Sequence, residues 1–350
     1  MTATPVQLAI VGGGAAGLFA AATARHRGVE CILVERKARV GTKMLMTANG
    51  RCNFTKDLSA ARMLQDLGEP VASFARTAVE ACPPAAIAGA LRDCGLRIRR
   101  MEDGRLFPAS GKAADVVHVF GDILRDGEVP LLANAPVAAL RPEGGAFSLE
   151  FRGFSLLARN VLVATGGLSF PKTGSVGDGH AFARSLGLRV EPCRPGLVGY
   201  NAPPCGWPPR LAGCRFETGA SAAVLVEGRE CFRCGGEVEF EPRCVSGAAV
   251  YNCSRWVARH APRSFSLCLS TPDGGLRLDD PSPRPLKEAI VTVSGVSLSE
   301  VDPATMRARK IPGLYFAGEV LDIDGPTGGY NLSLAFATAA LAVDSVARSP

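Results

Sequence analysis

Residues 6–17 of this chain read Val-Gln-Leu-Ala-Ile-Val-Gly-Gly-Gly-Ala-Ala-Gly. The apolar run 6–11 predicts a buried strand, the glycines predict a tight turn, and the alanine-rich stretch 18–27 predicts a helix. A second apolar run, 29–34, ends in Glu35. This order of strand, glycine turn, helix and strand predicts that one βαβ unit closes within the first 35 residues.

The glycine spacing in this unit is typical of a dinucleotide-binding turn. Gly12 permits the tight turn, Gly14 lets the backbone approach a pyrophosphate, and Gly17 allows the helix to pack closely on the sheet. The pyrophosphate is expected at the positively polarised start of the helix. Glu35, 18 residues after Gly17, is placed to accept hydrogen bonds from the adenosine ribose. The unit by itself fits NAD and FAD equally well.

Segments far from the first unit favour FAD. FAD is long, and its flavin half needs binding groups remote from the glycine turn. Two glycine-rich strand ends meet this need, Ala164-Thr-Gly-Gly167 and Ala317-Gly-Glu319, and the second carries a carboxylate suited to ribitol hydroxyls. The final helix, expected over 332–348, would direct its N-terminus at the flavin and stabilise an anionic reduced ring.

The rest of the chain predicts an α/β fold, a Rossmann-like FAD-binding domain of glutathione-reductase type with a smaller, mainly β inserted domain. The composition becomes rich in Pro, Cys and Gly near Arg194 and recovers near Glu288, so the domains are expected at 1–194, 195–287 and 288–350. The finer expectations are a long ordered loop at 36–56, two helical pieces in 59–91 broken at Cys82-Pro-Pro84, and short strands at 96–108, 129–140, 146–151, 160–164 and 314–317.

Composition excludes several classes of protein. Gly and Pro together supply 65 of 350 residues, too few for a low-complexity or collagen-like chain. The net charge of +6 is dispersed without a basic run.

Two uncharged stretches, 1–24 and 325–343, resemble membrane spans by hydropathy. The first lacks a basic start and contains the glycine turn, and the second opens as a glycine loop, so we expect no membrane association.

The twelve cysteines are irregularly spaced and predict reduced thiols in a cytoplasmic protein. Eight fall between Cys193 and Cys268, and one Cys-x-x-Cys pair, Cys231 and Cys234, is among them. The spacing of the other cysteines is too loose for a zinc site, so no metal is expected.

Six stretches that together span nearly the whole chain carry a further pattern. They are Val11-Gly-Gly-Gly-Ala-Ala-Gly17, Asn49-Gly-Arg-Cys-Asn53, Gly104-Arg-Leu-Phe-Pro108, Ala164-Thr-Gly-Gly-Leu-Ser-Phe-Pro-Lys-Thr-Gly174, Gly177-Asp-Gly179 and Gly313-Leu-Tyr-Phe-Ala-Gly-Glu-Val-Leu-Asp-Ile-Asp-Gly-Pro-Thr-Gly-Gly-Tyr-Asn-Leu332. In these stretches the chain resembles the bacterial FAD-dependent flavoproteins of the BaiN-like, aminoacetone-oxidase-like group of NAD(P)/FAD-dependent oxidoreductases. Its insert is shorter than the resemblance implies.

The resemblance implies which residues contact FAD. Lys43 and residues 51–53 would lie along the cofactor, residues 165–167 and 318–319 would bind its ribityl side, and Asp324 with residues 329–332 would lie against the flavin. A backbone contact from Val137 to adenine is also implied. The complete predicted set is Gly12, Gly13, Gly14, Ala15, Ala16, Gly17, Glu35, Arg36, Lys43, Arg51, Cys52, Asn53, Val137, Thr165, Gly166, Gly167, Gly318, Glu319, Asp324, Gly329, Tyr330, Asn331 and Leu332.

The sequence identifies no catalytic residue. Structural roles are favoured for three histidines, His26, His118 and His180, and packing is favoured over a thiol function for Cys52. The predicted activity is hydride transfer through FAD to or from a small organic substrate, with NAD(P)H-driven reduction of an unsaturated carbonyl as one form. An oxygen-dependent amine oxidase and a non-catalytic flavin-binding module remain alternatives. A flavoprotein acting on RNA is a further alternative, but because the sequence has no basic cluster we expect no nucleic-acid partner.

Overall fold

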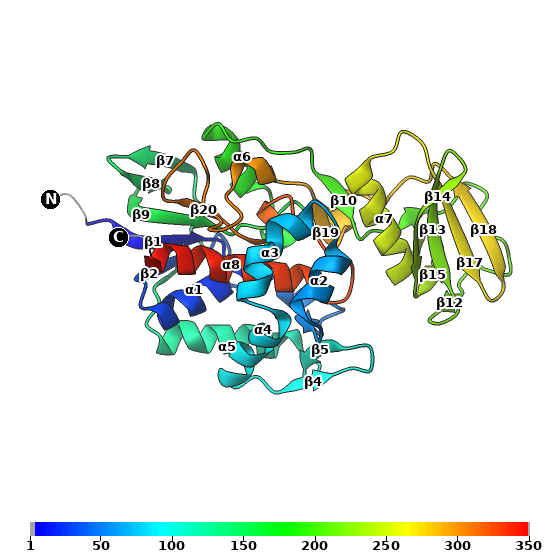
Figure 1. Ribbon diagram of the computed structural model, residues 1–350, viewed down its shortest axis with the longest axis horizontal. Helices are drawn as coiled ribbons and strands as arrows, with labels where there is room; N and C mark the ends of the chain where they lie inside the picture. The colour runs from blue at the N-terminus through cyan, green and yellow to red at the C-terminus, as the bar shows by residue number, and fades with distance from the viewer. Residues whose placement is uncertain (1–3, 349–350) are drawn as a thin grey trace. The chain divides into compact units, whose positions relative to one another are not determined.

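The computed structural model describes residues 4–348 and divides them into two compact units (Figure 1). Unit 1 contains residues 4–167, 171–192 and 294–348, and unit 2 contains residues 168–170 and 193–293. Unit 2 extends a few residues beyond the predicted insert, 195–287, on both sides. The extra residues belong to two short strands that pair with each other, Arg194–Gly196 and Val291–Val293.

Unit 1 is built on a seven-stranded sheet. Its strands are β1 (Val6–Val11), β2 (Cys31–Val34), β6 (Leu131–Leu132), β7 (Ala139–Glu143), β8 (Ala146–Glu150), β9 (Ser155–Val163) and β20 (Leu314–Phe316). They follow the order β6-β2-β1-β9-β8-β7, and β20 pairs with the end of β9. β6, β2, β1, β9 and β20 are parallel to one another, whereas β7 and β8 form an antiparallel extension. The carboxyl ends of β1, β9 and β20 therefore lie side by side, where parallel sheets bind ligands.

Helices accompany this sheet in unit 1. They are α1 (Ala15–Arg27), α2 (Ala60–Leu67), α3 (Val71–Ala81), α4 (Pro84–Asp93), α5 (Ala113–Asp126), α6 (Asp178–Ser185) and α8 (Tyr330–Arg348). α1 and α8 contact each other through stacked rings of Phe19 and Phe336, 4.9 Å apart. The prediction of two helical pieces in 59–91 was wrong, because the chain forms three. The additional break lies at Gly68, whose φ of 70° no helix accommodates, and at Pro70, which lacks the N–H of a helix interior.

A small antiparallel sheet completes unit 1, with strand order β3-β5-β4. Its strands are β3 (Thr55–Lys56), β4 (Ile98–Arg100) and β5 (Arg105–Pro108). β3 lies within the segment 36–56 that was predicted to be a loop without strands, and so does the 3-10 helix Met44–Met46. The other 3-10 helices are Pro171–Thr173, Leu286–Glu288, Leu298–Glu300 and Gly318–Val320.

Unit 2 has its own hydrophobic core, in which Tyr200, Phe240 and Val245 are buried. One helix, α7 (Ala248–His260), accompanies short antiparallel sheets, with β13, β14, β17 and β18 side by side in Figure 1. The strands are β10 (Arg194–Gly196), β11 (Tyr200–Asn201), β12 (Arg215–Phe216), β13 (Ser221–Val226), β14 (Arg229–Gly235), β15 (Val238–Phe240), β16 (Cys244–Ser246), β17 (Ser266–Thr271), β18 (Gly274–Asp279) and β19 (Val291–Val293).

The final helix is a core element of unit 1. Within residues 4–348, α8 alone is long and apolar enough to cross a membrane, and 72% of its apolar window is buried inside the protein. The other uncharged stretch, 1–24, forms β1 and most of α1 over its described part. Burial of this kind accounts for the apolar composition of α8, because a helix that is hydrophobic on all sides is typical of a protein core.

Candidate functional site

The glycine turn joins β1 to α1 and opens onto free space. Gly12 has φ of +112°, and a Cβ there would lie 2.5 Å from the Ala164 carbonyl oxygen at the end of β9. A Cβ on Gly17 would lie 1.8 Å from the Gly12 carbonyl oxygen, so α1 packs directly on the turn. A Cβ on Gly14 would meet nothing within 4 Å, and Gly14 caps α1 without a side-chain hydrogen bond. The first N–H groups of α1 therefore face an open space that suits an anion.

Glu35, at the end of β2, is tied to this turn by hydrogen bonds. Its Oε2 accepts from the backbone N–H of Gly13 at 2.7 Å, and its Oε1 accepts from the backbone N–H of Lys37 at 2.7 Å. The neighbouring Arg36 forms an ion pair with Asp178 of α6 at 2.7 Å. Val137 is buried, and Ala135, two residues before it, donates its backbone N–H to the Glu35 carbonyl. The residues predicted for the adenosine end therefore lie around one strand end.

An ion pair spans the middle of the site. Lys43 Nζ lies 2.6 Å from Glu319 Oε2, and about a fifth of each side chain is exposed (22% and 21%). Gly318 donates its backbone N–H to Thr338 of α8 at 3.0 Å, and a Cβ on Gly318 would lie 3.0 Å from the Cβ of Ala16. Gly318 is thus fixed between the start of α1 and the middle of α8, next to the glycine turn.

The other glycine-rich strand end follows β9. Thr165 accepts a hydrogen bond at its Oγ1 from the Gly179 backbone at 3.2 Å, and Gly166 has a positive φ of 71°. Because a Cβ on Gly12 would also lie 2.9 Å from the Thr165 Cα, the two glycine turns are in direct contact.

The start of α8 meets the segment that contains Asn53. A Cβ on Gly329 would lie 2.7 Å from the Thr55 carbonyl carbon and 3.0 Å from Asn53 Oδ1. That oxygen is buried and has no hydrogen-bond partner within the described chain. Asn331 instead holds the glycine loop, since its side-chain amide exchanges two hydrogen bonds of 2.9 Å with the Gly325 backbone.

Several residues predicted to bind FAD are buried or already contact other side chains of the protein. The Tyr330 hydroxyl donates to Asp66 of α2 at 2.5 Å, and Asp324 is buried. Cys52 is fully buried, and burial raises the pKa of its thiol to about 11, which agrees with a packing role. Arg51 is exposed, with its guanidinium 5.5 Å from the centre of the Phe107 ring.

The histidines have structural surroundings. His180 is buried, its Nε2 lies 3.1 Å from the Val320 carbonyl oxygen, and burial lowers its pKa. His26 and His118 are exposed on α1 and α5, and His260 stacks on Trp256 at 4.1 Å. Among residues 4–348, no group of three or more His, Cys, Asp or Glu is arranged to hold a metal ion.

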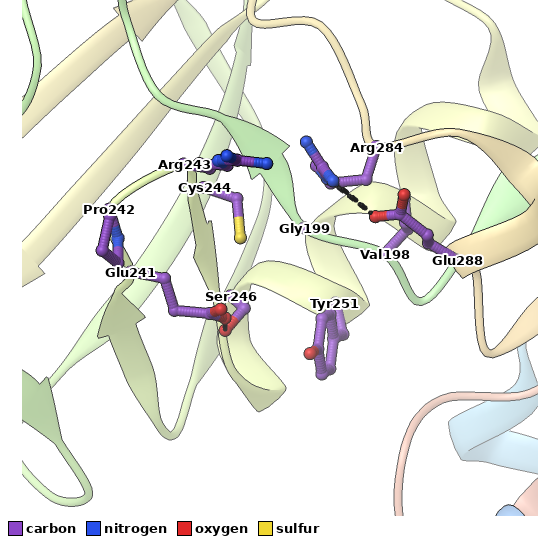
Figure 2. Close-up of a pocket in the computed structure, with 10 residues that line it drawn as sticks. All are labelled: Val198, Gly199, Glu241, Pro242, Arg243, Cys244, Ser246, Tyr251, Arg284 and Glu288. Atoms are coloured by element: carbon purple, nitrogen blue, oxygen red, sulfur yellow. Dashed lines mark hydrogen bonds and ion pairs between the residues drawn. The ribbon is translucent and has the colours of Figure 1, made fainter.

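A second candidate site lies within unit 2. It is a pocket of about 380 Å³ lined by β16, the start of α7 and the segment around Arg284 (Figure 2). Ser246 donates to Glu241 at 2.9 Å, and Arg284 pairs with Glu288 at 2.8 Å, as the dashed line shows. Burial raises the pKa of Tyr251, so its hydroxyl stays protonated at neutral pH and can donate a hydrogen bond.

The geometry of unit 1 fits FAD. It offers an uncapped helix start for a pyrophosphate, a carboxylate at the end of β2 for a ribose, and an unpaired buried oxygen on Asn53 for an N–H group of a ligand. A model of the HI0933-like protein Rossmann domain matches residues 6–345. The chain belongs to the HI0933-like family.

Two curated members resemble the chain over nearly its full length. The 3-dehydro-bile acid delta(4,6)-reductase of Clostridium scindens is 28% identical, with 98% of this chain and all of the relative covered. The ribosomal RNA dihydrouridine synthase of Escherichia coli is 27% identical, with 97% of each chain covered. The alignment with the first runs over 414 positions, so it contains gaps opposite the 350 residues of this HI0933-like chain.

Solved structures share the fold at low sequence identity. The 3-ketosteroid-Δ4-(5α)-dehydrogenase of Rhodococcus jostii has a TM-score of 0.62 at 13% identity, with 100% of this chain and 98% of that chain covered. The 3-ketosteroid Δ1-dehydrogenase of Sterolibacterium denitrificans has a TM-score of 0.60 at 14% identity, with 99% and 100% covered. Family membership and this fold confirm the predicted α/β Rossmann-type architecture, FAD as the cofactor and an FAD-dependent oxidoreductase as the enzyme class.

Sequence reasoning missed several residues of these sites. Asp66 and Asp178 each hold a predicted residue in place, but neither stands in a motif that signals this function. The polar lining of the unit 2 pocket was missed because it comes from β16, α7 and residues near 284–288, which local patterns do not connect. The relatives include two ribosomal RNA dihydrouridine synthases, so the expectation of no nucleic-acid partner is not carried forward.

Proposed function

We propose that this protein reduces a carbon–carbon double bond conjugated to a carbonyl group, with FAD as cofactor and a reduced nicotinamide as electron donor. The observation that carries the proposal is that two nearly full-length relatives are named for reactions of this chemistry. The unsaturation of a 3-oxo Δ4,6 steroid is conjugated to its carbonyl. The uracil ring of uridine likewise holds a double bond conjugated to a carbonyl, and its reduction gives dihydrouridine.

We assign FAD binding to the residues predicted from the sequence. The N-terminus of α1 at Gly14 would hold the pyrophosphate, Glu35 the ribose, and Asn53 Oδ1 would accept a hydrogen bond from the flavin ring. When bound, FAD supplies hydride transfer between the donor and the substrate. The Lys43–Glu319 ion pair would offer this site a hydrogen-bond donor and an acceptor side by side.

We assign substrate recognition in unit 2 to the pocket around Tyr251. Its hydroxyls and guanidinium groups donate hydrogen bonds of the kind a carbonyl oxygen accepts, and its carboxylates accept from N–H groups. The neutral Tyr251 hydroxyl is one of these hydrogen-bond donors. Tyr251→Phe is expected to weaken substrate binding about tenfold, by loss of one hydrogen bond, while leaving reduction by the nicotinamide unchanged.

We also place the protein in the cytoplasm. All twelve cysteines are free thiols, and nine of them are at least partly exposed. Free thiols of this kind persist in a reducing compartment. The oxygen-dependent and non-catalytic alternatives gain no support from the named relatives.

The test is an anaerobic visible spectrum of the purified protein before and after NADH or NADPH is added. Bleaching of the flavin bands, followed by their return on addition of a 3-oxo Δ4 steroid or a uridine-containing RNA, is the expected result. A flavin that neither nicotinamide bleaches would overturn the proposal, and so would one that only oxygen reoxidises.

A further inference from the structure

The small sheet of unit 1 carries an unusual concentration of basic side chains on one face. Residues directly opposite each other in antiparallel strands share a face, and residues two apart along a strand share it too. Lys56 of β3 is opposite Arg105 of β5, and Arg99 of β4 is opposite Phe107 of β5. Lys56, Arg105, Phe107 and Arg99 therefore lie on one face of the sheet. Strand pairing continues to Arg97, whose carbonyl accepts a hydrogen bond from the Ala109 N–H at 2.7 Å. Because Arg97 is two residues before Arg99, it lies on the same face.

Two arginines lie beside the aromatic ring of Phe107 in this sheet. The guanidinium carbons of Arg51 and Arg105 lie 5.5 and 5.7 Å from the centre of the Phe107 ring. Phe107 is buried, whereas Arg51, Arg97 and Arg99 are exposed. We call Arg51, Lys56, Arg97, Arg99 and Arg105 together the basic face.

The basic face is largely unneutralised. Arg105 pairs with Asp103 in the turn between β4 and β5, and Glu102 is exposed in the same turn. Across the described residues, Arg97 and Arg99 have neither an ion pair nor a side-chain hydrogen bond. Five basic residues against two acidic ones in so small an area give a field that attracts a polyanion rather than a ligand with one charge.

The basic face also adjoins the candidate cofactor site. Lys56 Nζ lies 5.9 Å from the centre of the Tyr330 ring, and the preceding Thr55 shares a hydrogen bond of 2.6 Å with Ser333 of α8. Tyr330 belongs to the segment proposed to lie near the flavin, residues 329–332, and Ser333 follows that segment directly. A polymer bound along the basic face would therefore reach the candidate reaction site.

We propose that the basic face binds the phosphate backbone of an RNA substrate. The inference rests on the proposed function and narrows its substrate to a uracil ring within RNA. Exposed guanidinium groups pair with phosphates through two donors and also stack on unpaired bases, which suits single-stranded or looped RNA. A steroid acid carries a single charge and would leave most of the basic face unused.

The test compares Arg97→Glu/Arg99→Glu with a matched control, Arg152→Glu/Arg159→Glu, which makes the same charge change at exposed arginines outside the basic face. The probe is a fluorescently labelled 20-nucleotide uridine-rich RNA, measured by anisotropy with FAD-loaded protein. We expect at least tenfold weaker binding for the basic-face variant and less than threefold for the control. We also expect the salt slope to fall by about 1.4, since each single-strand phosphate contact contributes about 0.7.

Three results would overturn the inference: no RNA binding by the unmodified protein, equal weakening in both variants, or equal binding of heparin and RNA. Neither substitution lies in the proposed cofactor set, so nicotinamide-driven flavin bleaching is expected to be unchanged in both variants. If the nicotinamide does not bleach the flavin of the unmodified protein, the proposed function fails. The RNA-binding measurement tests the basic face independently of that result.

Discussion

The carboxylate of Glu35 accepts a hydrogen bond of 2.7 Å from the backbone N–H of Gly13, 22 residues earlier in the chain. The end of β2 therefore fixes the glycine turn that precedes α1. Since charged hydrogen bonds contribute about 1.5–3 kcal/mol, this contact is strong enough to order the turn before a ligand arrives.

Glu35→Gln is expected to weaken FAD binding about tenfold, because the charge that holds the turn and would accept the ribose hydroxyls is lost. Fluorescence titration of the apoprotein with FAD measures the change. Glu30→Gln, an exposed carboxylate just before β2, is the control and is expected to bind as the unmodified protein does. Equal affinity for the Glu35 variant would contradict the assigned role.

Gly12→Ala is expected to lower the free energy of unfolding by about 3 kcal/mol or more and to abolish FAD retention. The new Cβ would lie 2.5 Å from the Ala164 carbonyl oxygen at a φ of +112°. Urea unfolding and the flavin content of the purified protein check this. Gly89→Ala, where a Cβ in α4 meets nothing within 4 Å, is expected to be neutral or slightly stabilising.

Replacing Lys43 by Met or Glu319 by Gln is expected to destabilise the protein by about 1 kcal/mol each, because each change removes a partly buried ion pair. The double variant is expected to be more stable, by about 0.5 kcal/mol or more, than the sum of the two single-variant losses predicts. If both residues contact FAD, its affinity will stay low in the double variant. If the double variant instead recovers FAD affinity together with stability, the ion pair supports the fold and does not contact FAD.

Cys52 is expected to resist alkylation by iodoacetamide at pH 7.5. Its thiol is fully buried, and because burial raises its pKa to about 11, the reactive thiolate forms only as the pH approaches that value. The exposed Cys205 and Cys231 serve as internal controls and should react first. Peptide mapping by mass spectrometry follows the order, and early modification of Cys52 would argue for a site open to solvent.

The sequence was sufficient for features that neighbouring residues encode. The βαβ unit follows from apolar runs and glycine spacing, and β1, α1 and β2 form within the predicted stretch of 35 residues. The final helix was predicted to within two residues of its observed start at Tyr330. Periodicity and turn residues act over a few positions, so they can be recognised without knowledge of the partners.

Tertiary structure decided which distant residues meet. Lys43 and Glu319 are 276 positions apart, and Tyr330 and Asp66 are 264 apart, so no local pattern connects them. The chain has no basic run, yet antiparallel pairing of β3, β5 and β4 gathers the basic face from residues 51–105. Strand order and register determine such neighbours, because a shift of one residue would turn Arg99 and Arg105 to the opposite face of the sheet.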